Sequence, residues 1–294
     1  MYYLVYAIFY LLSLLPWFVI YLISDGCYFL VYYVFKYRRE VVANNLLIAF
    51  PNKTDAERKL IAKQFYRNFT ETFVEAIKLL SISKSEMKKR FVLDVNHLKT
   101  LTNSYPKINL VSGHYFNWEF ANLGISLQSD LAFMGVYKPL SNKTFDRLML
   151  GLRSRFGTIL LASNNFRADF RTHSKGSYIL GLVGDQNAND TSKAFWIDFF
   201  GKKVPFVKGP ENGSKLYNTA IVYAYFHKVK RGYYSASFEL ITDKPNSYKE
   251  GDLTKILIKK IEDSIKQEPS NYLWTHRRWK HVFNPDHHAH LVVD

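Results

Sequence analysis

The chain has 294 residues, of which 48% are hydrophobic and 17% aromatic, a length that allows one sizeable α/β domain or two small domains. Its formal net charge of +15 indicates an anionic partner: nucleic acid, a membrane surface, an acidic protein or a phosphorylated substrate. Because Cys27 is the single cysteine, a disulfide framework and a cysteine-based zinc site are both excluded within one chain.

The N-terminal stretch, residues 1–23, contains no charged side chain, and only Ser13 and Pro16 interrupt its apolar run. About 20 apolar residues suffice for a helix to cross the hydrocarbon core, so we predict a membrane-spanning helix here, with a buried core helix as the alternative. A basic start and a small-residue cleavage site are absent from this stretch, which disfavours a signal peptide. Residues 24–26 are predicted to end the helix, and residues 27–35 are too short to span the bilayer.

Three cations, Lys36, Arg38 and Arg39, follow the apolar segment directly. By the positive-inside rule they hold the bulk of the protein on the cytoplasmic side of the membrane. We therefore divide the chain into a membrane anchor with an interfacial segment, residues 1–35, and a folded domain, residues 36–294.

Within the folded domain, residues 36–104 have a helical pattern and residues 105–294 an alternating one. Thr54 and Glu57 have the spacing of a capping box, which predicts the start of a helix. Short apolar runs predict buried strands at residues 108–112, 131–136, 158–162, 178–183 and 219–226. The predicted fold class is α/β, with a mixed, largely parallel sheet flanked by helices.

The first of these strands runs into a Gly turn, His114 and the start of a helix. Asn117 suits the N-cap of that helix, and Glu119 would then lie near its positive end. Five residues separate His114 from Glu119, which is about 140° on one helix, so the two side chains meet only if His114 lies in the turn. An ionised carboxylate beside an imidazole makes it a general base. The alternative is a core histidine followed by an ordinary amphipathic helix.

Further polar residues lie near the ends of the later strands. Lys138, Arg147, Arg153 and Arg155 are placed to bind a phosphate or a developing oxyanion, or else to form a solvated basic helix face. The strand at 178–183 leads to Asp185 and Gln186, where an acid can orient a neighbouring cation or cap a loop. The aromatic run at residues 195–200 suits either an acyl-chain pocket or the core.

The motifs form an ordered set along residues 37–280: Tyr-Arg-Arg at 37–39, Asn-Asn-Leu at 44–46, Phe-Pro at 50–51, Gly-His-x4-Glu at 113–119, Tyr-Lys-Pro at 137–139, Arg-Phe-Gly at 155–157, Asp-Gln at 185–186, Phe-Phe-Gly at 199–201, Gly-Pro at 209–210 and Trp-x-His-Arg-Arg at 274–278. This order resembles the lipid A biosynthesis acyltransferase family, the late or secondary acyltransferases of the lysophospholipid acyltransferase superfamily. The resemblance implies a glycerolphosphate-acyltransferase-like fold with an N-terminal membrane helix. It also implies a bacterial inner-membrane enzyme that moves a fatty acyl group from an acyl-carrier-protein thioester to a hydroxyl of a lipid A precursor, without a cofactor or metal.

On this resemblance His114 is the general base and Glu119 the acid that orients it, while Arg155 and Asp185 match polar positions around the site. Lys138 departs from the family pattern, which usually has Arg there, and Lys keeps the charge but loses the bidentate fork. The expected substrate-binding residues are Lys138, Arg147, Arg155 and Asp185.

Three other functions also fit parts of the sequence. The same acyl transfer could act on another acceptor: a phospholipid, an aminolipid or a glycolipid. A membrane-tethered nucleic-acid-binding protein would explain the charge and the aromatic residues, but it leaves the turn at His114 without a role. A pseudoenzyme scaffold would lack activity although the base and the acid are both present.

Overall fold

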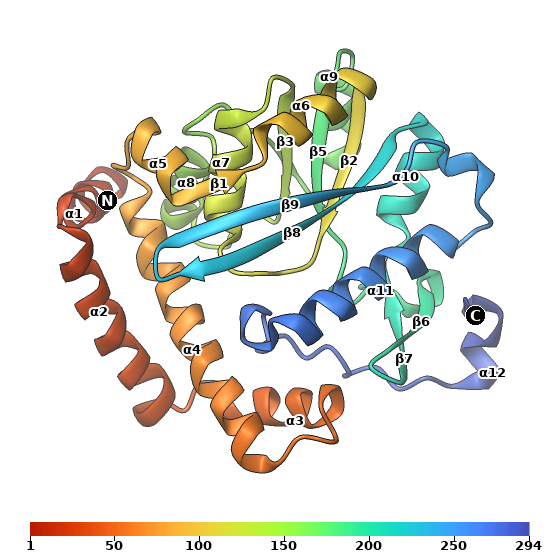
Figure 1. Cartoon of the computed structure of the whole chain (residues 1–294), viewed down its shortest axis with the longest axis horizontal. Coiled ribbons are helices and arrows are strands. Elements are labelled where there is room, and N and C mark those ends of the chain that lie inside the picture. Colours follow the sequence, from red (N-terminus) through yellow and green to blue (C-terminus); the bar gives the residue numbers. More distant parts are fainter. Residues whose placement is uncertain (294) are drawn as a thin grey trace.

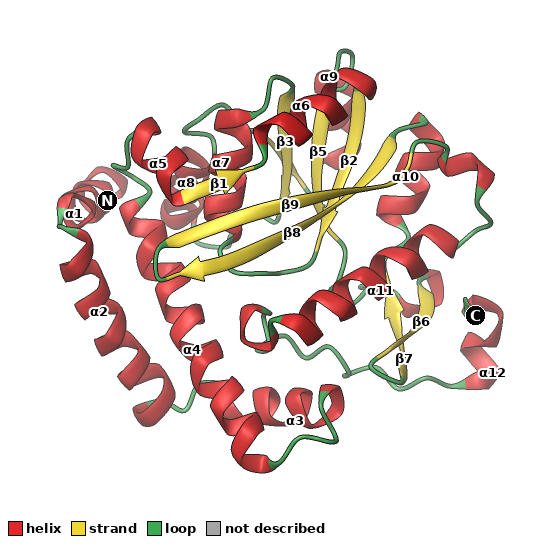
Figure 2. Cartoon of the chain, viewed as in Figure 1, coloured by secondary structure: helices red, strands yellow, loops and turns green. Residues whose placement is uncertain are grey.

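The computed structural model describes residues 1–293 and is built around one seven-stranded sheet in the order β1-β9-β8-β2-β5-β3-β4 (Figures 1 and 2). Neighbouring strands are parallel except β8 and β9, which form an antiparallel hairpin. The predicted class, α/β with a mixed and mostly parallel sheet, is confirmed. The strands are β1 (Phe91–Leu93), β2 (Lys107–Ser112), β3 (Ala132–Tyr137), β4 (Ile159–Ala162), β5 (Tyr178–Val183), β8 (Ala220–Lys230) and β9 (Tyr233–Thr242).

The five predicted strands correspond to β2, β3, β4, β5 and β8. Apolar runs did not predict β1 and β9, nor a separate hairpin of β6 (Phe195–Phe199) and β7 (Lys202–Phe206) in the aromatic run. β9 was not predicted because its buried side chains alternate with polar ones, whereas the predicted strands are continuous apolar runs.

Helices cover both faces of the sheet, and the longest of them, α4 (Asp55–Lys78), runs beneath it (Figure 1). The predicted capping box at its start is confirmed: Thr54 Oγ1 accepts the N–H of Glu57, and Glu57 Oε2 accepts the N–H of Thr54 at 2.7 Å. The other helices of the folded part are α3 (Arg39–Ala49), α5 (Lys84–Arg90), α6 (Val95–Ser104), α7 (Trp118–Gln128), α8 (Lys143–Arg153), α9 (Phe166–His173), α10 (Gly209–Tyr217), α11 (Asp252–Gln267) and α12 (Pro285–His288).

The N-terminal segment forms two helices where the sequence analysis expected one. α1 (Tyr2–Leu14) ends before Pro16, because proline biases the residue before it away from the helical region, and Leu15 has ψ of 144°. α2 (Trp17–Phe29) then runs through residues 24–26, which were predicted to break it, and continues as a π-helical turn (Leu30–Val34). Asp25 lies within the helix, and its carboxylate pairs with Arg231. The segment Trp17–Val34 is long and apolar enough to cross a membrane by length and composition.

Candidate active site

The candidate site lies where the parallel strands β2 and β5 end side by side. Their register pairs Ser112 with Val183, and the N–H of Gly184 donates to the carbonyl of Ser112 at 3.2 Å. The next residues of the two strands therefore leave the sheet together, which places His114 against Asp185. The imidazole Nδ1 of His114 is 2.6 Å from Asp185 Oδ1, and the backbone N–H of His114 donates to Oδ2 at 3.2 Å.

Asp185 is held as an anion by these contacts. Burial, with 1% of the residue exposed, would raise the pKa of its carboxyl. The charge and hydrogen bonds of His114, together with the hydroxyl of Tyr272, outweigh burial and lower the pKa of Asp185 to about 2. An ionised Asp185 accepts the Nδ1–H of the imidazole, which leaves Nε2 of His114 as the unprotonated, accepting nitrogen.

The imidazole of His114 is partly exposed. The side chain is 24% exposed, so a substrate group can reach it. In the structure the side-chain amide of Gln186 lies 3.1 Å from Nε2 and donates to it. The ring of Trp118 packs edge-on against the imidazole, with the ring centroids 6.4 Å apart. These contacts hold the ring in one orientation from three sides.

Glu119 does not contact the imidazole, which corrects the predicted pairing of His114 with Glu119. Its carboxylate instead binds the guanidinium of Arg153, with Nε of the arginine 3.0 Å from Oε2. Arg153 ends α8 beside the first turn of α7 and carries a permanent charge, so its burial requires a carboxylate partner. The carboxylate that orients His114 is therefore that of Asp185.

The predicted N-cap of α7 is confirmed: Asn117 Oδ1 accepts the N–H groups of Glu119 at 3.0 Å and Phe120 at 3.3 Å. Asn117 thereby fixes where the helix begins and aims Glu119 at Arg153. Burial by itself would lower the pKa of Arg153. The hydrogen bonds and the charge of Glu119 raise this pKa by more than burial lowers it, so the net shift is upward. The pair presents a guanidinium whose position is fixed by its own carboxylate.

A cavity of about 410 Å³ opens beside these groups. Its polar lining includes His114, Glu119, Lys138, Arg153 and Gln186. Its walls are largely apolar and include Leu110, Ile125, Phe133, Leu160, Leu182 and Leu273. An apolar cavity with a few convergent polar groups is typical of a site for a lipid or another largely apolar substrate.

Two of the predicted substrate-binding cations lie elsewhere. Arg155 points toward the end of α4, where Nη1 donates to the carbonyl of Leu79 at 2.7 Å. Arg147 lies over the ring of Tyr2 on α1, 4.1 Å from its centroid. Of the predicted set, the structure brings together His114, Asp185, Glu119 and Lys138. Of the other cations that the sequence offered, Arg153 lines the cavity and Arg155 does not.

The segment after α11 closes the site from the other side. The N–H of Leu273 donates to the carbonyl of His114 at 3.1 Å, and Asn45 on α3 donates to the carbonyls of Trp274 and His276. Tyr272 thereby reaches Asp185, a contact that no local sequence pattern indicated. Among residues 1–293, no group of three or more His, Cys, Asp or Glu side chains could hold a metal ion.

Comparisons with known proteins agree with the resemblance of the motifs. Residues 1–281 match the family model described as bacterial lipid A biosynthesis acyltransferase. The lipid A biosynthesis palmitoleoyltransferase of Escherichia coli (strain K12) is 24% identical over 248 residues, which cover 83% of this chain and 79% of the relative. The lipid A biosynthesis acyltransferase of Shigella flexneri has the same identity and coverage. The lipid A biosynthesis lauroyltransferase of E. coli (strain K12) is 22% identical over 271 residues, 90% of this chain and 87% of the relative.

Proposed function

Since the chain belongs to the bacterial lipid A biosynthesis acyltransferase family, we propose that it transfers a fatty acyl group from an acyl-carrier-protein thioester to a hydroxyl of a lipid A precursor. The observation that carries this proposal is the pair of His114 and Asp185 at the mouth of an apolar cavity that also contains Arg153 and Lys138. The cavity suits an acyl chain, the cations suit a phosphorylated acceptor, and the imidazole suits the proton transfer.

The reaction needs a base because an alcohol is largely protonated at neutral pH. Nε2 of His114 takes the proton of the acceptor hydroxyl as its oxygen attacks the thioester carbonyl carbon. The carbon–sulfur bond then breaks, and the protonated imidazole returns the proton to the departing thiolate. The products are an ester of the acceptor and the free thiol of the carrier protein. Ionised Asp185 holds the imidazole tautomer and stabilises the imidazolium that forms between these steps.

Two cations of the cavity serve the charges of the substrates. Arg153, fixed by Glu119, is positioned for a phosphate of the acceptor or for the oxyanion that develops on the thioester carbonyl. Lys138 lines the same cavity and supplies a point charge without the bidentate geometry of an arginine. The acceptor hydroxyl takes the place that Gln186 occupies at Nε2 of His114. No serine or cysteine nucleophile is needed, so the acyl group passes directly between the two substrates.

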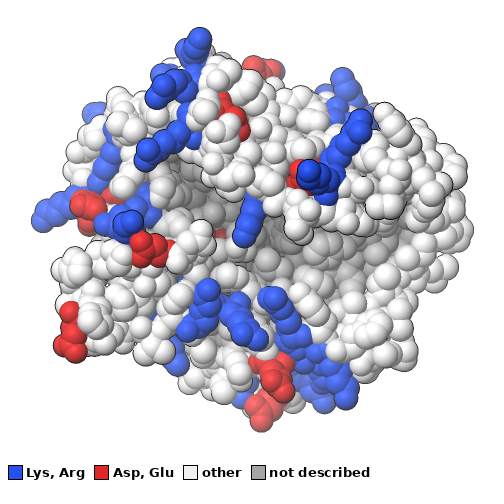
Figure 3. All heavy atoms as spheres, turned by 180° about the vertical axis from the view of Figure 1, so that it is seen from behind, with Lys and Arg blue, Asp and Glu red and all other residues white. Residues whose placement is uncertain are grey.

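The surface charge and the N-terminal segment support the location that we propose. Lys and Arg side chains gather around the central hollow of the face shown in Figure 3, where an acidic carrier protein and an anionic membrane could both approach. Residues 1–35 attach the enzyme to the inner membrane, and residues 36–294 form an acyltransferase domain on its cytoplasmic side.

A direct assay tests this function. The purified enzyme is given a labelled acyl-carrier-protein thioester with a lipid A precursor, a lysophospholipid, an aminolipid or a glycolipid as separate acceptors, and the products are identified by mass spectrometry. We expect acylation of the lipid A precursor and its loss in His114→Ala. Acylation of another acceptor alone would assign the same chemistry to that lipid, and no transfer to any acceptor would contradict the proposal.

A second histidine supplies a matched control for the assay. His227 also contacts a carboxylate, with Nδ1 2.9 Å from Glu268 Oε1, but it lies on β8 and does not line the cavity. His227→Ala should therefore leave transfer within about twofold of the unchanged enzyme, in contrast to the roughly 10²–10⁴-fold loss that removal of a general base causes. Equal losses in the two variants would mean that His114 is not the base.

A further inference from the structure

We propose that α1 and α2 lie along the membrane surface, docked on the catalytic domain, with their outer face in a single leaflet, rather than crossing the bilayer. This inference deepens the membrane attachment proposed above and depends on it. The partner is one leaflet of a bilayer with anionic headgroups. Length and composition alone would allow Trp17–Val34 to span, so the proposal depends on what the structure places against these helices.

One continuous stripe of both helices faces the protein. Its members recur every three or four residues and are buried or half-buried: Tyr2, Val5, Phe9, Ser13, Trp17, Ile20, Ser24, Tyr28 and Tyr32. The spacing continues through Pro16, so the bend between the helices keeps the stripe on one side. One stripe of the helix pair is therefore covered by the domain along its whole length, and the opposite side is exposed.

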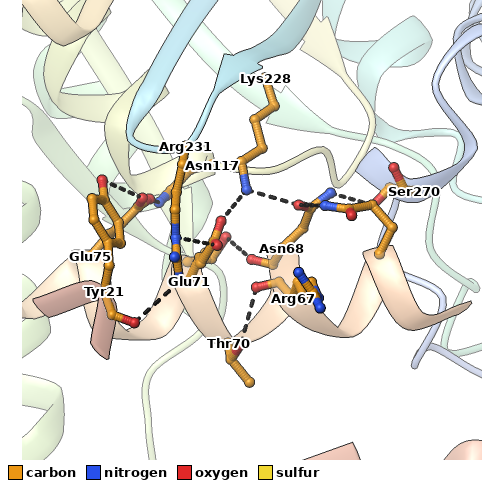
Figure 4. Close-up of polar contacts among 12 residues, drawn as sticks. Tyr21, Arg67, Asn68, Thr70, Glu71, Glu75, Asn117, Lys228, Arg231 and Ser270 are labelled. Atoms are coloured by element: carbon orange, nitrogen blue, oxygen red, sulfur yellow. Dashed lines mark hydrogen bonds and ion pairs between the residues drawn. The ribbon is translucent and has the colours of Figure 1, made fainter. Parts of the chain in front are cut away.

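Charged groups of the catalytic domain contact α2, and Figure 4 shows three of them, Glu71, Lys228 and Arg231. Asp25 lies halfway along Trp17–Val34, and its carboxylate binds Arg231 at 2.5 Å. Arg231 comes from the turn between β8 and β9, and its Nε lies 2.7 Å from the buried carboxylate of Glu71 on α4. Lys228 pairs with the same Glu71. If α2 crossed the bilayer in this arrangement, these charges and the tip of the hairpin would lie at the centre of the hydrocarbon, where charge is costly.

The hairpin approaches α2 closely at Gly232. Its φ is +73°, and a Cβ at this position would lie 1.8 Å from the hydroxyl of Tyr21. That hydroxyl in turn donates to Glu75 Oε1 at 3.3 Å, beside the bond from Asn117 to the same carboxyl group (Figure 4). Glycine is therefore required where the turn contacts the helix, so α2 and the domain pack closely at this position.

The bend between the two helices is also held by the domain. Lys78 at the end of α4 donates to the carbonyls of Ser13 and Leu15, at 2.8 and 2.7 Å, and Ser81 donates to the carbonyl of Ser13. These carbonyls are left without helical partners because Pro16 interrupts the chain. In a crossing topology this bend would lie on the far side of the membrane from the cytoplasmic domain, and Lys78 could not reach it.

α1 packs on α8, which borders the active-site cavity. The rings of Phe9 and Phe145 are 6.1 Å apart edge-on, and Arg147 lies over Tyr2. At about 1.5 Å per residue, the 13 residues of α1 reach only about 20 Å, which is short of a hydrocarbon core about 30 Å thick. α1 therefore suits the surface of a bilayer and brings that surface to the side of the cavity.

The outer face of the two helices is apolar and is bordered by cations. Leu4, Ile8, Leu11, Phe18, Leu22 and Phe29 are each half or more exposed. Arg147 of α8 lies beside the start of α1, and Lys36 and Arg38 follow α2 in the chain. All three side chains are exposed. In Figure 3 the side of the molecule that carries these helices shows a broad surface without charged side chains. Apolar side chains in the acyl layer with cations at the headgroups are the arrangement of an interfacial helix.

Cross-linking in native membranes tests the proposal, with Cys27→Ser as the background. Phe9→Cys combined with Phe145→Cys should join α1 to α8 through a short bis-maleimide, because the two side chains face each other. Leu11→Cys with Phe145→Cys is the matched control: Leu11 is on the same helix but 65% exposed on its outer face, and we expect at least a fivefold lower yield. If α2 crossed the bilayer, neither pair would react.

Sidedness supplies the second measurement. Tyr2→Cys in the same background is treated with a membrane-impermeant maleimide in spheroplasts and in inverted vesicles. Reaction from the cytoplasmic face, or protection from both faces together with the Phe9–Phe145 cross-link, supports the proposal; reaction from the periplasmic face, or absence of the cross-link, overturns it. Acyl transfer by the same membranes shows that each variant is folded. Active membranes without the cross-link would reject the docked topology and leave the proposed function standing.

Discussion

Two regions of the molecule bury a carboxyl group, and they shift its pKa in opposite directions. At the carboxyl edge of the sheet, His114 and Tyr272 overcome the effect of burial and lower the pKa of Asp185 to about 2. At the contact of α2 with α4, burial raises the pKa of Glu75, which accepts hydrogen bonds from Tyr234 at 2.6 Å and Asn117 at 3.0 Å.

The difference lies in the partners. Both groups are almost completely buried, with 1% and 0% of Asp185 and Glu75 exposed. Asp185 faces an imidazole that can carry a positive charge, whereas the groups bonded directly to Glu75 are neutral donors. A charge that must form during a reaction needs a fixed counter-charge, and a junction between helices needs only satisfied hydrogen bonds. Changes at the two carboxyl groups should therefore have different consequences.

Asp185→Asn should have the largest effect, and it should fall on activity. The amide can donate to Nδ1 of His114 and so favours the tautomer whose Nε2 carries the proton and is no longer a base. We expect kcat to fall by about 10²–10⁴-fold while the circular dichroism spectrum is kept. Asp198→Asn, at an exposed pair with Lys203, is the control and should leave kcat unchanged. A loss below tenfold for Asp185→Asn would show that the carboxylate does not set the tautomer.

Arg153→Ala should have the next largest effect and should lower both activity and stability. It leaves the carboxylate of Glu119, 3% exposed, without its counter-charge. We expect a loss of about 2–3 kcal/mol in the free energy of unfolding, less than for a fully buried pair because Arg153 is a quarter exposed. Urea denaturation measures it. Arg153→Met combined with Glu119→Leu should recover much of the stability but not the activity, and equal stability of the single and double variants would contradict the pairing.

Glu75→Ala should affect stability first. It leaves the hydroxyl of Tyr234 and the amide of Asn117 without an acceptor, and each unsatisfied buried group costs about 1–3 kcal/mol. Glu75→Gln keeps an oxygen acceptor and the shape, so its free energy of unfolding at pH 5 should lie within about 1 kcal/mol of the unchanged protein. Thermal unfolding of both variants in detergent gives the comparison. Equal losses in Ala and Gln would mean that Glu75 acts as an anion.

The smallest expected effect is the pH dependence, in which the two carboxyl groups should differ in sign. The pKa of Glu75 is raised in the folded state, so its contribution to stability is lost as pH rises above about 4.3, the value in the unfolded chain. Glu75→Gln should therefore gain stability relative to the unchanged protein as the pH rises above about 4.3. The pKa of Asp185 is lowered, so its contribution is lost as pH falls from about 4 toward 2. Asp185→Asn should flatten that acid limb, and parallel curves for all three proteins would contradict both assignments.

Much of the site's framework was predictable because it depends on neighbours in sequence. The strand before His114, the N-cap at Asn117 and the capping box of Thr54 all follow from patterns within a few residues. The contact of Asp185 with His114 spans 71 residues. The sequence indicated this contact only in that each of the two residues follows a predicted buried strand. Predicting the pair would also require the order and the register of those strands. Tyr272 and Glu75 carried no local signal because each acts through a partner distant in the chain.

The partners of Glu119 and Asp185 could not be predicted from their neighbours in sequence. Glu119 is close to His114 in sequence, yet the start of α7 turns it toward Arg153 on α8. Asp25 on α2 likewise pairs with Arg231, which lies 206 residues away in the chain. In each case a charge is matched by the partner that the packing brings nearest.

The amino-acid sequence by itself determined the α/β class, the histidine after the first buried strand, the family and the apolar N-terminal segment, because motif order and the alternation of polar and apolar residues are local properties. The tertiary structure decided which carboxylate faces His114, which arginine enters the cavity and how α1 and α2 lie on the domain. Buried charges are costly without a counter-charge, and which counter-charge is within reach depends on strand register and helix packing, which no single segment contains.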